Sequence, residues 1–114
     1  MAMRFQNLQF EDVELDGHSI SLQIKPTDEL IDMANRIRKG FGCTDLVEID
    51  ANNEVYYNFY LCCFPLQTRI ELLFTCHNGY SDDWVEYDLL ETPLTDKEVA
   101  DLMFQVIWYI GRSM

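Results

Sequence analysis

Apolar and polar residues alternate along much of the chain, at the two-residue period of strands whose two faces differ. The clearest run is residues 54–64, in which Val55, Tyr57 and Phe59 fall on one side and Tyr56, Asn58 and Tyr60 on the other. Pro65 ends this run, and Asp16-Gly17 marks a hairpin turn between the first two runs. The pattern predicts six strands, over residues 8–15, 19–24, 46–49, 54–64, 69–76 and 84–90.

Two further segments carry apolar residues at helical spacing. Residues 28–39 are preceded by Thr27, which can cap a helix, and followed by Gly40, which can end it. The final segment begins with Thr95-Asp96-Lys97-Glu98, the pattern of a capping box. An apolar stripe that can face the sheet consists of Val99, Leu102, Met103, Val106 and Ile110. Four further apolar residues make this stripe wider than packing on one sheet face requires: Phe104, Ile107, Trp108 and Tyr109.

The predicted element order is β-β-α-β-β-β-β-α, with short turns between neighbouring strands. We expect a single α+β domain spanning residues 1–114. The arrangement that buries the apolar faces of these elements with the fewest layers is a two-layer sandwich, in which both helices cover one face of an antiparallel sheet.

The chain is acidic, with 20 Asp and Glu against 8 Lys and Arg and a formal net charge of −12. Such a charge disfavours direct binding to nucleic acid or to an anionic membrane, because both are negatively charged. No apolar run is long enough for a membrane span, and the first residues do not resemble a signal peptide. Together with four cysteines that fit no secreted disulfide framework, these features predict a cytoplasmic protein.

The acidic residues are concentrated in one part of the chain. Residues 82–101 contain eight Asp and Glu and a single basic residue, Lys97. Within the last predicted strand, Glu86 and Asp88 share a face at a spacing of about 6.6 Å. A row of this kind can present regular negative charge to a basic groove, or it can simply keep the surface solvated.

Residues that could carry catalysis or bind metal are present, but in unfavourable arrangements. Zinc ligands would come from Cys62-Cys63 and Cys76-His77, yet adjacent residues on a strand point to opposite faces. A Cys–His nucleophile pair would need positive surroundings to lower its thiol pKa, and these surroundings are negative. The acids around Asp82-Asp83 lack the ligand spacing of a calcium loop. We therefore expect no enzyme activity, no metal and no cofactor.

The face of the sheet opposite the helices carries more aromatic residues than a solvated face usually does. Aromatic side chains are enriched among the residues that dominate protein–protein binding. Our first hypothesis is a non-catalytic domain that binds a basic partner protein, for example one that binds nucleic acid, and inhibits or masks it. Its predicted anchors are Tyr56, Tyr60 and Trp84, and its predicted steering acids are Asp82, Asp83, Glu86, Asp88 and Glu91.

In size, acidity and helix-on-sheet order, the chain resembles several classes of small protein-binding proteins. Bacterial toxin-immunity proteins and phage anti-defence inhibitors imply masking of a basic nuclease groove. Type III secretion chaperones are similar too, but they open with a helix where this chain opens with a hairpin. They imply the alternative hypothesis, a homodimeric chaperone or assembly subunit of a secretion- or phage-type system. Its dimer contact would be the sheet face or the last helix.

Overall fold

A computed structural model describes residues 4–43, 46–48, 55–78, 84–90 and 92–113 of the protein. In these residues five strands form one antiparallel sheet, in which each strand pairs with its neighbour in the sequence, and two helices pack on it. The predicted α+β class is therefore confirmed. The elements are β1 (Phe10–Asp16), β2 (Ser19–Ile24), α1 (Asp28–Gly40), β3 (Val55–Phe64), a 3-10 turn (Pro65–Gln67), β4 (Arg69–Asn78), β5 (Trp84–Asp88) and α2 (Asp96–Ser113).

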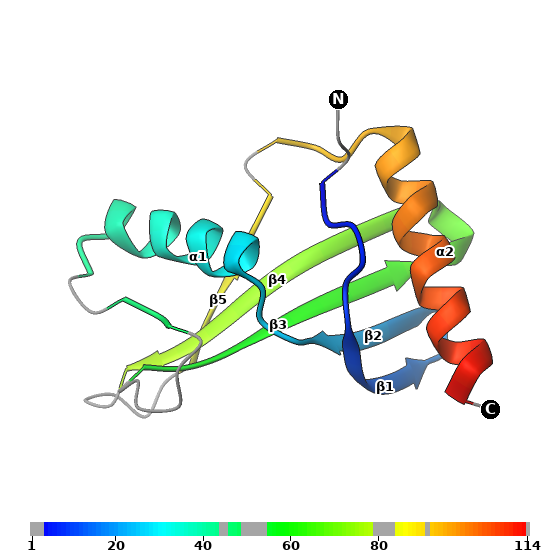
Figure 1. The fold of residues 1–114 in the computed structure, drawn as a ribbon, viewed down its shortest axis with the longest axis horizontal. Coiled ribbons are helices and arrows are strands. Elements are labelled where there is room, and N and C mark those ends of the chain that lie inside the picture. Colours follow the sequence, from blue (N-terminus) through cyan, green and yellow to red (C-terminus); the bar gives the residue numbers. More distant parts are fainter. Residues whose placement is uncertain (1–3, 44–45, 49–54, 79–83, 91, 114) are drawn as a thin grey trace.

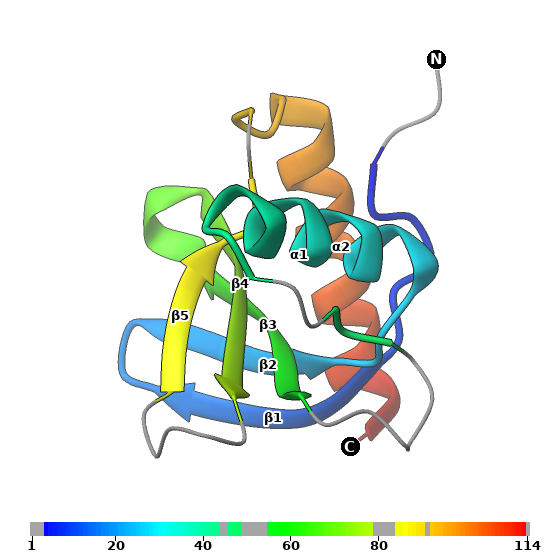
Figure 2. The ribbon, with the colours of Figure 1, turned by 90° about the vertical axis from the view of Figure 1, so that its left-hand side faces the viewer.

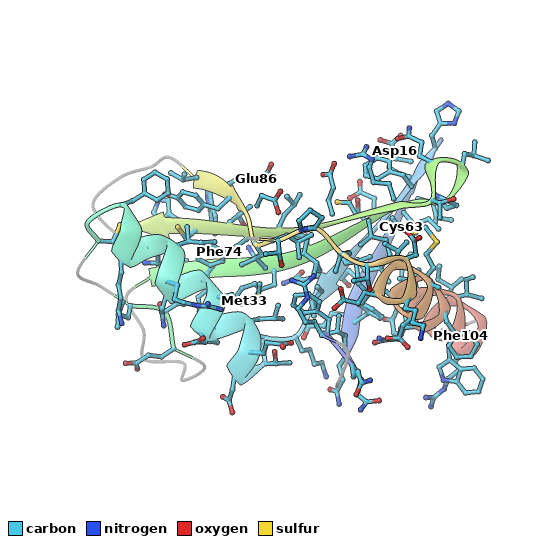
Figure 3. All side chains as sticks on the ribbon, turned by 90° about the horizontal axis from the view of Figure 1, so that it is seen from above. Asp16, Met33, Cys63, Phe74, Glu86 and Phe104 are labelled. Carbon is cyan, nitrogen blue, oxygen red and sulfur yellow. The ribbon has the colours of Figure 1, made fainter. Side chains whose placement is uncertain are left out.

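Both helices lie on the same side of the sheet, as the sequence predicts. Helix α1 covers one end of β3 and β4, and α2 lies at their other end, beside β1 and β2 (Figures 1 and 3). The sheet is strongly twisted, so that the β1–β2 hairpin lies crosswise to β4 and β5 (Figure 2). We call the face under the helices the inner face and the opposite one the outer face.

The core consists of the inner-face side chains of the sheet and the apolar stripes of both helices. Phe59 on β3 and Phe74 on β4 are paired in the sheet register, and their ring centroids lie 5.3 Å apart. Tyr87 of β5 stacks on Phe74 at 6.1 Å and continues the aromatic layer. The fully buried residues also include Leu22, Ile24, Leu30, Leu61, Leu72, Leu89, Leu102 and Val106.

The helix starts form as the sequence predicts. The Thr27 hydroxyl accepts a hydrogen bond from the Leu30 amide at 3.2 Å, which satisfies one of the unpaired donors of the first turn of α1. At the start of α2, the Glu98 amide donates to Thr95 Oγ1 at 3.2 Å. The Thr95 amide donates in return to Glu98 Oε1 at 2.9 Å, which completes the capping box.

The strand predicted over residues 46–49 is not formed in the part that the structure describes. Leu46, Val47 and Glu48 have no strand structure, and residue 49 lies outside the described residues. The Val47 amide donates to Asn35 Oδ1 at 2.9 Å, and the Asn35 Nδ2 donates to the Val47 carbonyl at 3.0 Å. The side chain of Asn35 thus occupies both backbone groups that a neighbouring strand would use. The prediction of a strand here was wrong because this contact depends on the fold and not on the local pattern.

Substitution of Asn35 by alanine is expected to destabilise the protein by about 2 kcal/mol, because it leaves both backbone groups of buried Val47 without their partner. Thermal and urea denaturation measure this loss. Arg36→Ala is the matched control on the same helix, since the ion pair of Arg36 with Asp32 is exposed and its loss should cost less than about 0.5 kcal/mol. Equal losses in the two variants would mean that the contact of Asn35 with Val47 contributes nothing.

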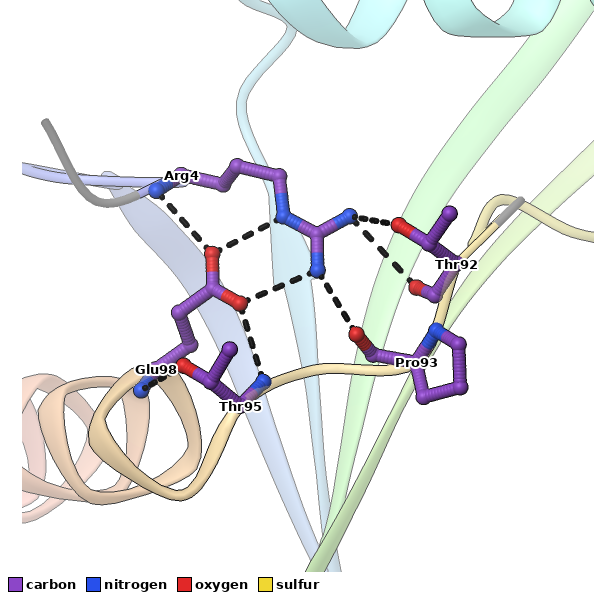
Figure 4. A network of polar contacts seen from close by, with 5 residues as sticks. All are labelled: Arg4, Thr92, Pro93, Thr95 and Glu98. Carbon is purple, nitrogen blue, oxygen red and sulfur yellow. Dashed lines mark hydrogen bonds and ion pairs between the residues drawn. The ribbon is translucent and has the colours of Figure 1, made fainter. Parts of the chain in front are cut away.

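An ion pair attaches the segment before β1 to the start of α2 (Figure 4). Arg4 Nε and Nη2 donate to the two carboxylate oxygens of Glu98 at 2.8 and 3.0 Å. The same guanidinium donates to Thr92 Oγ1 at 2.9 Å and to the Pro93 carbonyl at 3.0 Å. Because Glu98 is 6% exposed and Arg4 pairs with it in a two-point geometry, this contact is of the stronger kind. It lowers the pKa of Glu98 to about 2, with the hydrogen bond from Arg4 as the largest cause and the Thr95 amide as the next.

Candidate functional site

Neither helix of the described residues covers the outer face of the sheet, and the side chains of this face form cross-strand rows set by the register. Tyr56 pairs with His77, which pairs with Trp84. Tyr60 lies between Gln23 of β2 and Leu73 of β4, and Asp88 follows Leu73 on β5. The further outer-face residues are Glu14, Asp16, Ser19, Ser21, Asn58, Cys62, Phe64, Arg69, Glu71, Thr75 and Glu86.

The first row is an exposed aromatic strip across β3, β4 and β5. The ring centroids of Tyr56 and His77 lie 6.3 Å apart, and those of His77 and Trp84 lie 5.4 Å apart. Tyr56 is 65% exposed and Trp84 is 53% exposed, so most of their ring surface is available to another molecule. Large aromatic side chains are characteristic of binding surfaces, because they bury much apolar area for little loss of conformational entropy.

Beside this strip the outer face is hollowed. A depression of about 440 Å³ lies over Tyr60, Leu73 and Cys62, with Ser21 and Gln23 along it. Three carboxylates line it, Asp12 and Glu14 from β1 and Glu86 from β5 (Figure 3 labels Glu86 on this side of the sheet). In a flat sheet, β1 and β5 would be about 19 Å apart. The two edges can line one depression only because the sheet curves, with the outer face on its concave side.

The polar groups in the floor of the depression are held in place by contacts between strands. Gln23 Nε2 donates to Asn58 Oδ1 at 2.9 Å, and the Ser21 hydroxyl lies 3.5 Å from Cys62 Sγ. These contacts fix the side chains of β2 against those of β3, so the floor is preformed. A preformed site loses less conformational entropy when it binds a partner.

Arg69, the arginine that β4 contributes to the outer face, already contacts two residues of the same face. Arg69 forms an ion pair with Glu71, and its guanidinium carbon lies 4.2 Å from the Phe64 ring centroid. This pair neutralises the corner near the 3-10 turn. The depression and the β1 and β5 edges therefore keep their negative charge, from Asp12, Glu14, Asp16, Glu86 and Asp88.

Five of the eight site residues that the sequence predicts lie on this one face. Tyr56, Tyr60, Trp84, Glu86 and Asp88 share the outer face, although Tyr60 belongs to the depression and Tyr56 and Trp84 to the aromatic strip. Asp88 also has a structural part, since its Oδ1 accepts from the Leu90 amide at 2.9 Å just after β5 ends. The predicted steering acids Asp82, Asp83 and Glu91 lie outside the described residues.

The acids of β1 were missed in the sequence analysis. Asp12 and Glu14 line the depression, and the register of β1 is shifted between Phe10 and Val13. The sequence does indicate that these acids share one face of the strand, because Asp12, Glu14 and Asp16 alternate with Val13 and Leu15. Sequence alone could not show that the far edge of the sheet curves toward β5.

The cysteines and histidine that could have formed a zinc site do not converge. Cys62 and His77 lie on the outer face, whereas Cys63 and Cys76 are buried on the inner face. Burial raises the pKa of the Cys63 thiol, which is the opposite of what a nucleophilic cysteine needs. Among the residues that the structure describes, no three His, Cys, Asp or Glu side chains gather closely enough to hold a metal ion.

Comparisons with known proteins add no further constraint on this site. No protein-family model, no curated protein and no solved structure matches the chain. In the described residues, no helix is both long and apolar enough to cross a membrane.

Proposed function

We propose that the protein is a non-catalytic binding domain that masks a basic partner protein with the outer face of its sheet. The observation that carries the proposal is the concave face that α1 and α2 leave uncovered, on which carboxylates from β1 and β5 border a floor of Tyr60 and Leu73. A hollow of about 440 Å³ can receive lysine or arginine side chains. The floor offers them the ring of Tyr60, and cations are attracted to aromatic faces.

The two kinds of side chain have separate parts in this binding. Glu14, Asp16, Glu86 and Asp88 attract a basic surface over a distance and raise the rate of association. Tyr56, Tyr60 and Trp84 bury apolar surface once the partner has docked, and this contact sets how long the complex lasts. A surface that binds nucleic acid fits this face, because such a surface is basic. A partner that docked here through that surface could no longer bind nucleic acid with it. The four free thiols suit a reducing compartment, and the cytoplasm belongs to the proposal for that reason.

Charge reversal on the two edges of the outer face is expected to weaken binding of a nona-arginine peptide by about 10-fold or more at low salt. The test variant is Glu14→Lys/Glu86→Lys. The control is Glu29→Lys/Asp32→Lys on α1, which changes the net charge by the same amount on the helix side. Calorimetric titration measures both affinities, and circular dichroism checks that both variants are folded.

The control should bind within about two-fold of the unaltered protein if the attraction is local to the outer face. If both double variants lose affinity equally, the outer face has no special part and only the net charge acts. An affinity that stays the same from low to high salt would also contradict the electrostatic part of the proposal.

A further inference from the structure

Helix α2 presents a second exposed surface that the masking function does not use. Phe104, Ile107 and Trp108 are 65%, 68% and 59% exposed, although α2 also buries Leu102 and Val106 against the sheet. The Phe104 and Trp108 rings stack on each other, with centroids 6.4 Å apart. Phe104 projects away from the sheet and from the outer face (Figure 3).

This surface is comparable in area to the largest apolar patch of a typical monomeric protein, and such patches often serve in binding. Three exposed side chains of this size present on the order of 400 Å² of contiguous apolar area. The same helix side carries small residues at each end, Ala100 before the large ones and Gly111 after them. We call these five residues, Ala100, Phe104, Ile107, Trp108 and Gly111, the α2 stripe.

We propose that the α2 stripe binds the α2 stripe of a second copy of this chain, with the two helices antiparallel. Along the α2 stripe the side chains are small, large, large, large and small in turn. This order of sizes is nearly symmetric about residue 106. With a two-fold axis beside that residue, Phe104 of one copy lies opposite Trp108 of the other. Each end of the stripe, at Ala100 and Gly111, then offers space where the other helix approaches. A two-fold contact requires this self-complementarity.

Charges beside the α2 stripe support the antiparallel direction. Asp101 and Arg112 flank the same side of the stripe, near its opposite ends. In the antiparallel pair, Arg112 of each copy faces Asp101 of the other, which gives two symmetric ion pairs. In a parallel pair, the two-fold axis runs along the helices and puts the flank with Asp101 and Arg112 on opposite sides of the contact in the two copies, so neither ion pair forms. The helix dipoles also favour the antiparallel direction.

The glycine in α2 points to the same close approach. A Cβ placed on Gly111 would meet nothing within 4 Å, and its φ is not positive, so neither packing nor backbone conformation within one copy requires glycine there. Glycine inside a helix nevertheless costs stability relative to alanine. A second helix lying close to Gly111 supplies a reason for it, as small residues do where helices come into contact.

A second copy fits the α2 stripe better than the basic partner does. The outer face has an excess of carboxylates, whereas the charged residues along α2 and its neighbouring groove include both signs, with Lys25, Asp101 and Arg112 lining the groove of about 1000 Å³. A basic protein would gain little here. The dimer leaves both outer faces open, so that one dimer could hold two basic partners or two sites of one partner.

Sedimentation velocity over a concentration series tests the proposal on the full chain. Two stripes of this area bury less than a standard stable interface does, so we expect a weak dimer, with a dissociation constant on the order of 10 µM. Phe104→Glu and Trp108→Glu should each weaken it by at least about 30-fold. Leu66→Glu is the control, because Leu66 is 85% exposed in the 3-10 turn and outside the α2 stripe, and it should leave the dimer unchanged.

Reversal of the flanking charges tests the direction. Arg112→Glu alone and Asp101→Lys alone should each weaken the dimer several-fold, and the double variant should restore it. A chain that remains monomeric at 100 µM would overturn the proposal. So would a dimer that Phe104→Glu and Leu66→Glu affect equally. A dimer that the double charge reversal fails to restore would overturn the antiparallel arrangement.

Discussion

Substitution of Phe74 by alanine is expected to lower the free energy of unfolding by about 4 kcal/mol, the largest effect of any change considered for this protein. Phe74 is fully buried at the centre of the inner face, and its ring lies 5.3 Å from Phe59 and 6.1 Å from Tyr87 between ring centroids. Removal of the ring leaves a cavity between strands that pair closely on both sides. The neighbouring rings cannot close it without distortion of the sheet.

Urea denaturation followed by circular dichroism measures this loss. Leu66→Ala is the control, since Leu66 is exposed and should change the unfolding free energy by less than about 0.5 kcal/mol. A loss under about 1.5 kcal/mol for Phe74→Ala would mean that the aromatic layer of β3, β4 and β5 is not the centre of the core.

The second large effect is expected at the ion pair between Arg4 and Glu98. Arg4→Met keeps most of the side-chain volume but leaves the Glu98 carboxylate buried without its cation. At pH 7 we expect a loss of about 3 kcal/mol, at the lower end for a buried pair because the Arg4 side chain is 32% exposed. The loss should also free the segment before β1, because the Arg4 guanidinium holds Thr92 and Pro93 as well.

The pH dependence identifies the cause of this loss. The pKa of Glu98 lies at about 2 in the folded protein against 4.5 ordinarily, so the pair contributes fully above pH 4.5. Its contribution is lost progressively as the pH falls from 4.5 through 2, because the carboxylate is protonated first in the unfolded state and then, below about pH 2, in the folded state as well. The difference between the unaltered protein and Arg4→Met should therefore shrink over this range. A difference that is the same at pH 7 and pH 2.5 would show that the variant acts through packing and not through charge.

The parts of the fold that the sequence predicts are those decided by local chemistry. The two-residue alternation of β3 and β4 identifies which side chains face the helices, because a strand has only two faces. The capping box of Thr95 and Glu98 identifies the start of α2, because its hydrogen bonds lie within four residues. The outer-face position of Tyr56 and Tyr60 follows from the same alternation.

The parts that the sequence does not predict depend on contacts between distant residues. Asn35 holds Val47 in a loop where the local pattern suggested a strand. Arg4 forms its ion pair with Glu98, which lies 94 residues later in the sequence. The curvature that brings Asp12 and Glu14 to the same depression as Glu86 belongs to the whole sheet, and no short segment encodes it. The candidate site therefore has two acidic edges, whereas the sequence indicated only one.

The most direct test of the binding face is a map of the residues that contact a cationic probe. Isotope-labelled protein is titrated with a nona-arginine peptide at low and at physiological salt, and backbone amide shifts are followed by nuclear magnetic resonance. We expect shift changes at Gln23, Tyr60, Leu73 and Glu86 that diminish as salt is added. Changes centred on α1 or α2, or spread evenly over the acidic surface, would contradict a role for the outer face.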